Sequence, residues 1–151
     1  MKKLLLAVFL LTTGFAVNAQ NKKHVFSEKQ MRKAEKPVHK IIFQLTTEDT
    51  LAHKSLMKQL NNITTIAPDT KLEVVCQGPG LNMLVIGKTT VQDKMQQMKK
   101  KGVAFVACEF SMSERKVTKE KIIAEADFVK AGIIEIVTKQ EAGWSYIKAG
   151  F

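Results

Sequence analysis

The chain has 151 residues, a formal net charge of +10 at pH 7 and 45% hydrophobic residues. That length suits one domain with a hydrophobic core of its own. Its two cysteines, Cys76 and Cys108, are too few for a disulfide-rich fold, so a small scaffold held together by disulfides is excluded.

Residues 1–19 have the organisation of a secretory signal peptide. Two lysines follow Met1, residues 4–17 are almost wholly apolar, and Val17-Asn18-Ala19 matches the positions that a signal peptidase reads. The apolar run is shorter than the roughly 20 residues that span a bilayer. We therefore expect cleavage after Ala19, export to the periplasm and no stable membrane anchor in the mature protein.

Residues 20–37 are polar and basic, with few apolar side chains that could dock against a domain. We interpret this segment as a flexible N-terminal arm. A basic arm can bind nucleic acid or an anionic membrane surface. This one lacks interleaved aromatic residues, and export argues against nucleic acid, so we expect a solvated tail.

The folded domain, 38–151, is predicted to begin with a strand over 39–45. A helix follows, starting at Thr46-Thr47-Glu48-Asp49, with hydroxyl groups for its N-cap and acidic residues in its first turn, where the helix dipole favours them. Its apolar stripe is made of Ala52, Leu56, Leu60, Ile63 and Ala67, and Pro68 ends it. A second strand over 72–76 leads into the Gly78-Pro79-Gly80 loop and a short apolar stretch.

A second helix is predicted from Thr90, with Asp93 completing a capping box and Gly102 ending the helix. Residues 103–107 form a continuous apolar run that is typical of a strand buried on both faces. After a brief irregular or helical segment, Thr118 is predicted to cap a third helix. A strand over 126–129 and a closing helix over 133–147 complete the chain, and the closing stripe comprises Ile133, Val137, Trp144 and Ile147.

Strands and helices thus alternate along the domain. Such alternation is typical of a mostly parallel sheet with helices on both faces. We therefore predict a three-layer α/β/α sandwich with four to five strands.

Cys108 is the candidate catalytic residue, because it stands where an inner strand of the predicted sheet ends. Open α/β sheets bind ligands at the carboxyl ends of their strands. Backbone amides after Cys108 can stabilise a thiolate, and Arg115 and Lys116 can add positive potential, whereas Glu109 opposes it. A purely structural cysteine is the alternative.

Other candidate groups are weaker. Gly78, Pro79 and Gly80 could present amides to a ligand, but they match no phosphate-loop pattern, and a plain turn is the alternative. Cys76 follows two valines and is expected to be an inert core thiol; a disulfide to Cys108 is allowed but not required. The three histidines have no metal-ligand spacing, so no metal or cofactor is predicted.

The chain resembles the DsrE/DsrF-like family from about residue 40 to its end. The matching segments are Ile41–Leu45, His53–Leu56, Leu60–Asn62, Glu73–Leu81, Gly102–Glu109 and Gln140–Ile147. The resemblance implies an α/β/α sandwich, assembly into dimers, trimers or hexamers, and sulfur trafficking through a persulfide on the matching cysteine, Cys108. Phe110-Ser111 stands where many relatives carry Asn-Thr, and the signal peptide also departs from the better-understood cytoplasmic relatives.

Two functions follow as hypotheses. The first is an exported, sulfurtransferase-like sulfur carrier, which uses Cys108 and exchanges sulfur with a donor or acceptor protein. The second is a non-catalytic, oligomeric binding module for a small ligand or a protein. Reactivity of Cys108 separates them, because a buried and unreactive sulfur is compatible only with the second.

Overall fold

The computed structural model describes residues 38–150 of the chain. The predicted signal peptide (1–19) and basic arm (20–37) lie outside these residues, as does Phe151. Cleavage after Ala19 and export therefore stay predictions.

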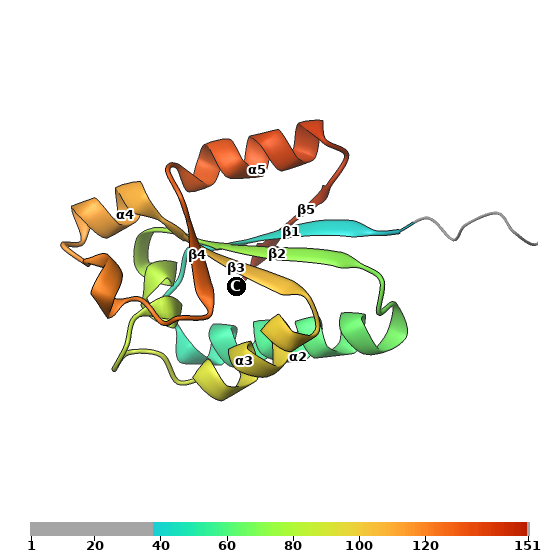
Figure 1. The fold of residues 1–151 in the computed structure, drawn as a ribbon, viewed down its shortest axis with the longest axis horizontal. Coiled ribbons are helices and arrows are strands. Elements are labelled where there is room, and N and C mark those ends of the chain that lie inside the picture. Colours follow the sequence, from blue (N-terminus) through green and yellow to red (C-terminus); the bar gives the residue numbers. More distant parts are fainter. Residues whose placement is uncertain (1–37, 151) are drawn as a thin grey trace, which may run out of the picture. The chain divides into compact units, whose positions relative to one another are not determined.

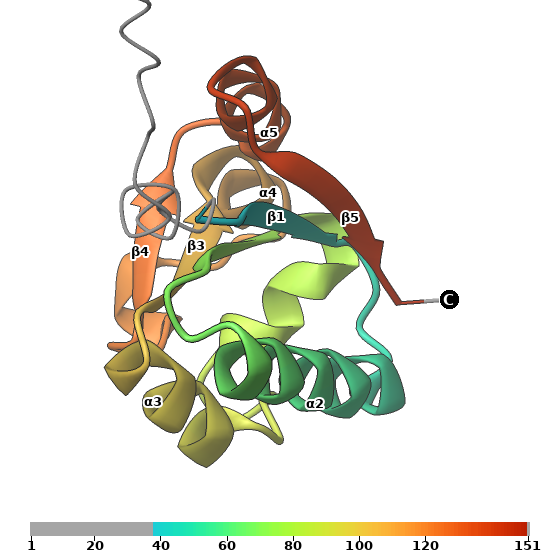
Figure 2. The same cartoon turned by 90° about the vertical axis from the view of Figure 1, so that its right-hand side faces the viewer.

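Five strands form one sheet, and every neighbouring pair is parallel (Figures 1 and 2). In chain order they are β1 (Lys40–Leu45), β2 (Lys71–Cys76), β3 (Val103–Cys108), β4 (Ala126–Val129) and β5 (Ser145–Ala149). Their order across the sheet is β4-β3-β2-β1-β5. The prediction of a parallel α/β sandwich is confirmed, because helices cover both faces of this sheet.

Helices α2 (Thr50–Ile66) and α3 (Gln92–Lys100) lie on one face of the sheet, and α5 (Gly132–Glu141) lies on the other (Figures 1 and 2). The short helix α4 (Glu109–Glu114) follows β3 directly, and two 3-10 helices, η1 (Gly78–Leu84) and η2 (Lys119–Lys121), occupy connections. Within residues 38–150, no helix combines the length and the apolar character needed to cross a membrane.

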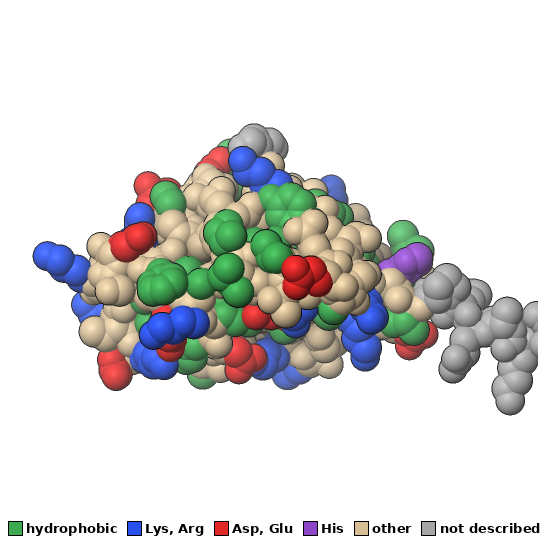
Figure 3. All heavy atoms as spheres, turned by 90° about the horizontal axis from the view of Figure 1, so that it is seen from above, with side chains coloured by type: hydrophobic (Ala, Val, Ile, Leu, Met, Phe, Trp, Pro, Cys, Tyr) green, Lys and Arg blue, Asp and Glu red, His purple; other side chains and the backbone are tan. Residues whose placement is uncertain are grey.

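The two faces of the sheet are covered unequally. The larger buried cluster contains Phe43, Val74 and Phe105 from the sheet together with Leu56 and Met95 from α2 and α3. On the α5 face the buried cluster is small, with Ile42, Val75, Val106 and Ile136. Figure 3 views the molecule from the α5 side, where several hydrophobic side chains reach the surface. This face is therefore held by less apolar packing than the other.

The predicted closing helix over 133–147 is wrong in its second half. α5 ends at Glu141, and the chain reverses at Gly143, whose φ of +81° is readily adopted only by glycine. Residues 145–149 then form β5, an edge strand paired only with β1. Ile133 and Val137, predicted to lie on one stripe of this helix, are 55% and 42% exposed, and Ile136 packs on the sheet instead.

Three local predictions also need correction. The Thr90–Asp93 capping box is absent, because α3 begins at Gln92 and its N-cap Val91 offers no side-chain hydrogen bond. The helix after Thr118 is only the single 3-10 turn η2, without a side-chain cap. The Gly78-Pro79-Gly80 loop is the start of η1 rather than a plain turn.

Candidate functional site

Cys108 is the last residue of β3 and the N-cap of α4, so its sulfur lies at the carboxyl edge of the sheet. It lines a pocket of about 450 Å³. The pocket walls come from the segments after β1 and β2 (Thr46, Gln77) and from the first turns of α4 and α5 (Phe110, Ile133). Cys108 itself is only 4% exposed, so the pocket is the path by which another molecule can reach the sulfur.

Two helix starts converge on this sulfur. The backbone N–H of Gly132, in the first turn of α5, donates to Cys108 Sγ at an N···S distance of 3.2 Å. Ser111 lies in the first turn of α4, and its Oγ accepts the backbone N–H of Gly78 at 2.8 Å. Since that bond uses only a lone pair, the hydroxyl proton of Ser111 remains available to the sulfur.

These contacts favour the thiolate form of Cys108. Burial has the largest single influence on the pKa of Cys108 and raises it. The Ser111 hydroxyl, followed by the amides of Ser111, Gly132 and Phe110, outweighs burial and leaves the pKa below the ordinary thiol value. A thiolate is the nucleophilic form of cysteine, so this arrangement prepares the sulfur to attack an electrophile.

Gly132 is at this position because no side chain fits there. A Cβ atom on residue 132 would lie 2.4 Å from Gln77 Oε1, 2.9 Å from Val75 Cγ1 and 3.4 Å from Cys108 Cβ. The absence of a side chain therefore lets the start of α5 approach the ends of β2 and β3 closely enough to place an amide at the sulfur.

The charged residues near Cys108 in the sequence make contacts of their own. Glu109 forms ion pairs with Lys119 at 2.7 Å and Lys130 at 3.7 Å, and these lysines lower the pKa of its carboxyl group. Its negative charge is thus compensated. Arg115 and Lys116, which were expected to add positive potential, are not among the residues that line the pocket.

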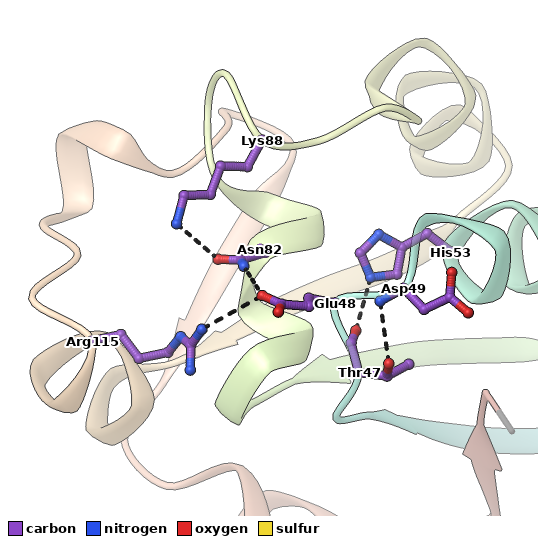
Figure 4. A network of polar contacts seen from close by, with 7 residues as sticks. All are labelled: Thr47, Glu48, Asp49, His53, Asn82, Lys88 and Arg115. Carbon is purple, nitrogen blue, oxygen red and sulfur yellow. Dashed lines mark hydrogen bonds and ion pairs between the residues drawn. The ribbon is translucent and has the colours of Figure 1, made fainter.

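Figure 4 shows where the Arg115 guanidinium points. Its Nη2 lies 3.9 Å from Glu48 Oε2, and that oxygen also accepts a hydrogen bond from Asn82 Nδ2 at 2.7 Å. Lys88 Nζ donates to Asn82 Oδ1 at 3.3 Å. This network ties the segment after β1 to η1 and to the end of α4, so Arg115 supports the loops around the site.

The glycine-rich segment contributes through its backbone. Among Gly78, Pro79 and Gly80, Gly78 lines the pocket, and its N–H is already bonded to Ser111. Gly80 packs directly against the backbone of Leu45, whose carbonyl oxygen would lie 2.2 Å from an added Cβ. The segment therefore holds the Ser111 hydroxyl through the Gly78 amide and packs against the end of β1.

Cys76 and Cys108 are both free thiols on opposite faces of the sheet. Cys76 pairs with Ala107 across β2 and β3, and both belong to the larger core cluster. Because successive side chains of a strand alternate in direction, Cys108 points to the α5 face. Cys76 is fully buried, and burial raises its pKa far above the ordinary value. The expectation of an inert core thiol at this position agrees with these surroundings.

No cluster of three or more histidine, cysteine, aspartate or glutamate side chains within 38–150 could hold a metal ion. His53 is buried on α2, where its Nε2 lies 2.9 Å from the Thr47 carbonyl oxygen (Figure 4). His39 is exposed before β1, and His24 lies outside the described residues.

Sequence reasoning did not single out Ser111 or Gly132 as site residues. The signal for Ser111 was its place three residues after Cys108, where a first helical turn brings its hydroxyl back to the sulfur. The signal for Gly132 was a glycine just after a short strand and just before an apolar helical pattern. Such a glycine marks a close backbone approach, but its target depends on the tertiary fold.

The fold and the site together define a small parallel α/β domain with a cysteine at the carboxyl edge of its sheet. The chain belongs to the DsrE/DsrF-like family, whose model matches residues 39–149. A similar solved structure is a protein of unknown function, MTH1491, from Methanobacterium thermoautotrophicum. It has a TM-score of 0.69 and 23% sequence identity, and the match covers 73% of this chain and 98% of that one. No curated protein sequence matches the chain.

Proposed function

We propose that this protein is a thiol-based sulfur carrier that holds a persulfide on Cys108. The observation that carries the proposal is the sulfur of Cys108 at the base of a pocket, with the Gly132 amide 3.2 Å away and the Ser111 hydroxyl beside it. Membership of the DsrE/DsrF-like family adds support, since that family is associated with sulfur relay.

The proposed loading step needs no external oxidant. The Cys108 thiolate attacks the terminal sulfur of a donor persulfide, forming a new S–S bond as the S–S bond of the donor breaks. The donor sulfur leaves as a thiolate with the electron pair. In the delivery step, an acceptor nucleophile takes the outer sulfur, and Cys108 leaves as a thiolate. A depressed pKa makes Cys108 the better leaving group in that second step.

Intact-mass measurement after incubation with a persulfide donor tests the proposal. Wild-type protein should gain the mass of one sulfur atom, about 32 Da, on the peptide that carries Cys108. The matched variants are Cys108→Ser, which should gain nothing, and Cys76→Ser, which should load like the wild type. A folded protein whose Cys108 stays unmodified would contradict the carrier proposal and favour the alternative, a non-catalytic binding module using the same pocket.

A further inference from the structure

Helix α5 is attached to the sheet by few apolar contacts. The helix contributes Ile136 to the small buried cluster on its face of the sheet, where Ile136 packs with Val75 and Val106. Ile133, Ile134 and Val137 on the same helix are at least 42% exposed. Since apolar burial under α5 is small, polar contacts must contribute strongly to where the helix lies.

The shorter of the two ion pairs made by Lys139 of α5 is with a buried carboxylate. Lys139 Nζ lies 2.6 Å from Glu73 Oε2 and 3.3 Å from Glu135 Oε1. It also lies 4.7 Å from the centroid of the Trp144 ring. Glu73 is only 5% exposed and sits in β2, where it pairs in register with Ile42 of β1 and Ala104 of β3.

Glu73 depends on Lys139 for compensation of its charge. Its second oxygen, Oε1, is buried and has no hydrogen-bond partner among the described residues. A buried charge that loses its partner is strongly unfavourable, so the pair resists separation. The position of the Lys139 ammonium over β2 is thereby fixed, and with it the position of the helix that carries Lys139.

The same helix delivers the Gly132 amide to Cys108. Gly132 and Lys139 are separated by about two helical turns, which places them on the same face of α5. One end of that face contacts the Cys108 sulfur, and the other contacts Glu73. We propose that the Glu73–Lys139 ion pair positions α5 on the sheet so that the Gly132 amide stays on the Cys108 sulfur. Glu73 and Lys139 are thus positioning residues, and this inference rests on the proposed role of Cys108 as the reactive thiol.

A purely long-range electrostatic effect would have a different sign. Removing the Glu73 charge would then stabilise the Cys108 thiolate slightly, because one nearby negative charge is lost. If the ion pair instead holds α5 in place, removing the Glu73 charge loosens α5, weakens the contact between the Gly132 amide and the sulfur, and destabilises the Cys108 thiolate. Glu73→Gln, which keeps the side-chain shape, separates these explanations, whereas Lys139→Met destabilises the thiolate under both.

The experiment is the pH profile of iodoacetamide labelling at Cys108, followed on its own peptide by mass spectrometry, together with the ¹⁵N–¹H shift of the Gly132 amide across the same titration. Lys139→Met and Glu73→Gln should each raise the apparent pKa of Cys108, by about one pH unit for Lys139→Met. Both should reduce the response of the Gly132 amide to thiolate formation. Lys139→Arg should restore wild-type behaviour. Lys99→Met is the matched control, because it removes an ion pair between α3 and Asp127 in which no residue of α5 takes part.

A Glu73→Gln profile that is unchanged or shifted to lower pH would overturn the inference. This result is distinct from failure of the carrier proposal, in which Cys108 of the folded wild-type protein does not react at all. If Lys139→Met does not fold, Glu73→Gln still decides between the two signs.

Discussion

The amide nitrogen of Gly132 lies 3.2 Å from the sulfur of Cys108, although β4 separates the two residues along the chain. The sulfur therefore accepts a hydrogen bond from the start of α5, and the Ser111 hydroxyl and the amides at the start of α4 also lower its pKa. Its chemistry depends on how α5 packs as well as on the residues next to it in sequence.

Gly132→Ala should raise the pKa of Cys108 and slow its labelling at neutral pH. The added Cβ would collide with Gln77 Oε1 and Val75 Cγ1, so the start of α5 must move away from the sulfur. The measurement is the pH profile of iodoacetamide labelling. Gly87→Ala is the control for backbone strain without a collision, because an alanine there is strained by the φ of +80° but meets no neighbouring atom. Equal labelling profiles for Gly132→Ala and the wild type would contradict this prediction.

Ser111→Ala should also raise the pKa of Cys108, since the thiolate loses a hydroxyl donor. It leaves the Gly78 N–H without its bond to Ser111 Oγ, at a cost of about 1–3 kcal/mol in the free energy of unfolding. Labelling kinetics and urea denaturation measure the two effects. Ser113→Ala removes an exposed hydroxyl from the same helix, and both quantities should stay at their wild-type values in that variant.

Cys76→Ser should destabilise the fold without changing the reactivity of Cys108. The hydroxyl would lie in a fully buried apolar cluster, with an expected cost of about 1–3 kcal/mol in the free energy of unfolding if it finds no hydrogen bond. Urea denaturation measures the loss, and labelling of Cys108 provides the comparison. Faster labelling of Cys76 than of Cys108 in the folded wild type would refute the assignment of roles.

The stability that Cys108 contributes should increase with pH. Its folded-state pKa is lowered, so the unfolded chain binds more protons between that value and the unfolded thiol value of about 8.5. The stabilisation is therefore present at higher pH and is lost as pH falls through the folded-state pKa. The difference in unfolding free energy between wild type and Cys108→Ser should grow across this window, and Cys76 cancels in the comparison. A difference that is flat or shrinks with pH would be inconsistent with a stabilised thiolate.

The domain should self-associate through the α5 face. Ile134 and Val137 are exposed on α5, and Tyr146 is partly exposed on the edge strand β5, in register with Ile42, which faces α5. Such apolar groups are common at the contact surfaces of oligomers. Light scattering should give a mass above that of one chain, and Ile134→Glu should lower it. Ile66→Glu, an equally drastic change at an 84% exposed site on α2, is the matched control. A monomeric wild type at high concentration would exclude this assembly.

The sheet could be predicted because its inner strands are short, continuous apolar runs, such as Val103–Cys108. Such runs are typical of strands that are buried on both faces of a parallel sheet. β5 could not, because Ser145–Lys148 are exposed at the edge, and their spacing continues the pattern of the preceding helix. Gly143 was the local sign of a break, but a single glycine at a helix end does not specify the strand that follows.

Only part of the site could be predicted from the sequence, because some of its contacts are made by tertiary packing. Cys108 could be singled out because a strand end is visible in the sequence. Gly132 and the Glu73–Lys139 pair depend on the packing of α5 against β2 and β3, which brings together residues far apart in the chain. The charges next to Cys108 were misleading, since Arg115 binds Glu48 instead of the sulfur.

The placement of Cys76 and Cys108 on opposite faces of the sheet also determines what oxidation can do to this protein. The chain has no third cysteine, and a disulfide between its two cysteines would require the backbone to rearrange. A sulfenic acid formed on Cys108 therefore has no resolving thiol within the same folded molecule. A thiol from another molecule can convert it to a mixed disulfide by entering the pocket that Cys108 lines.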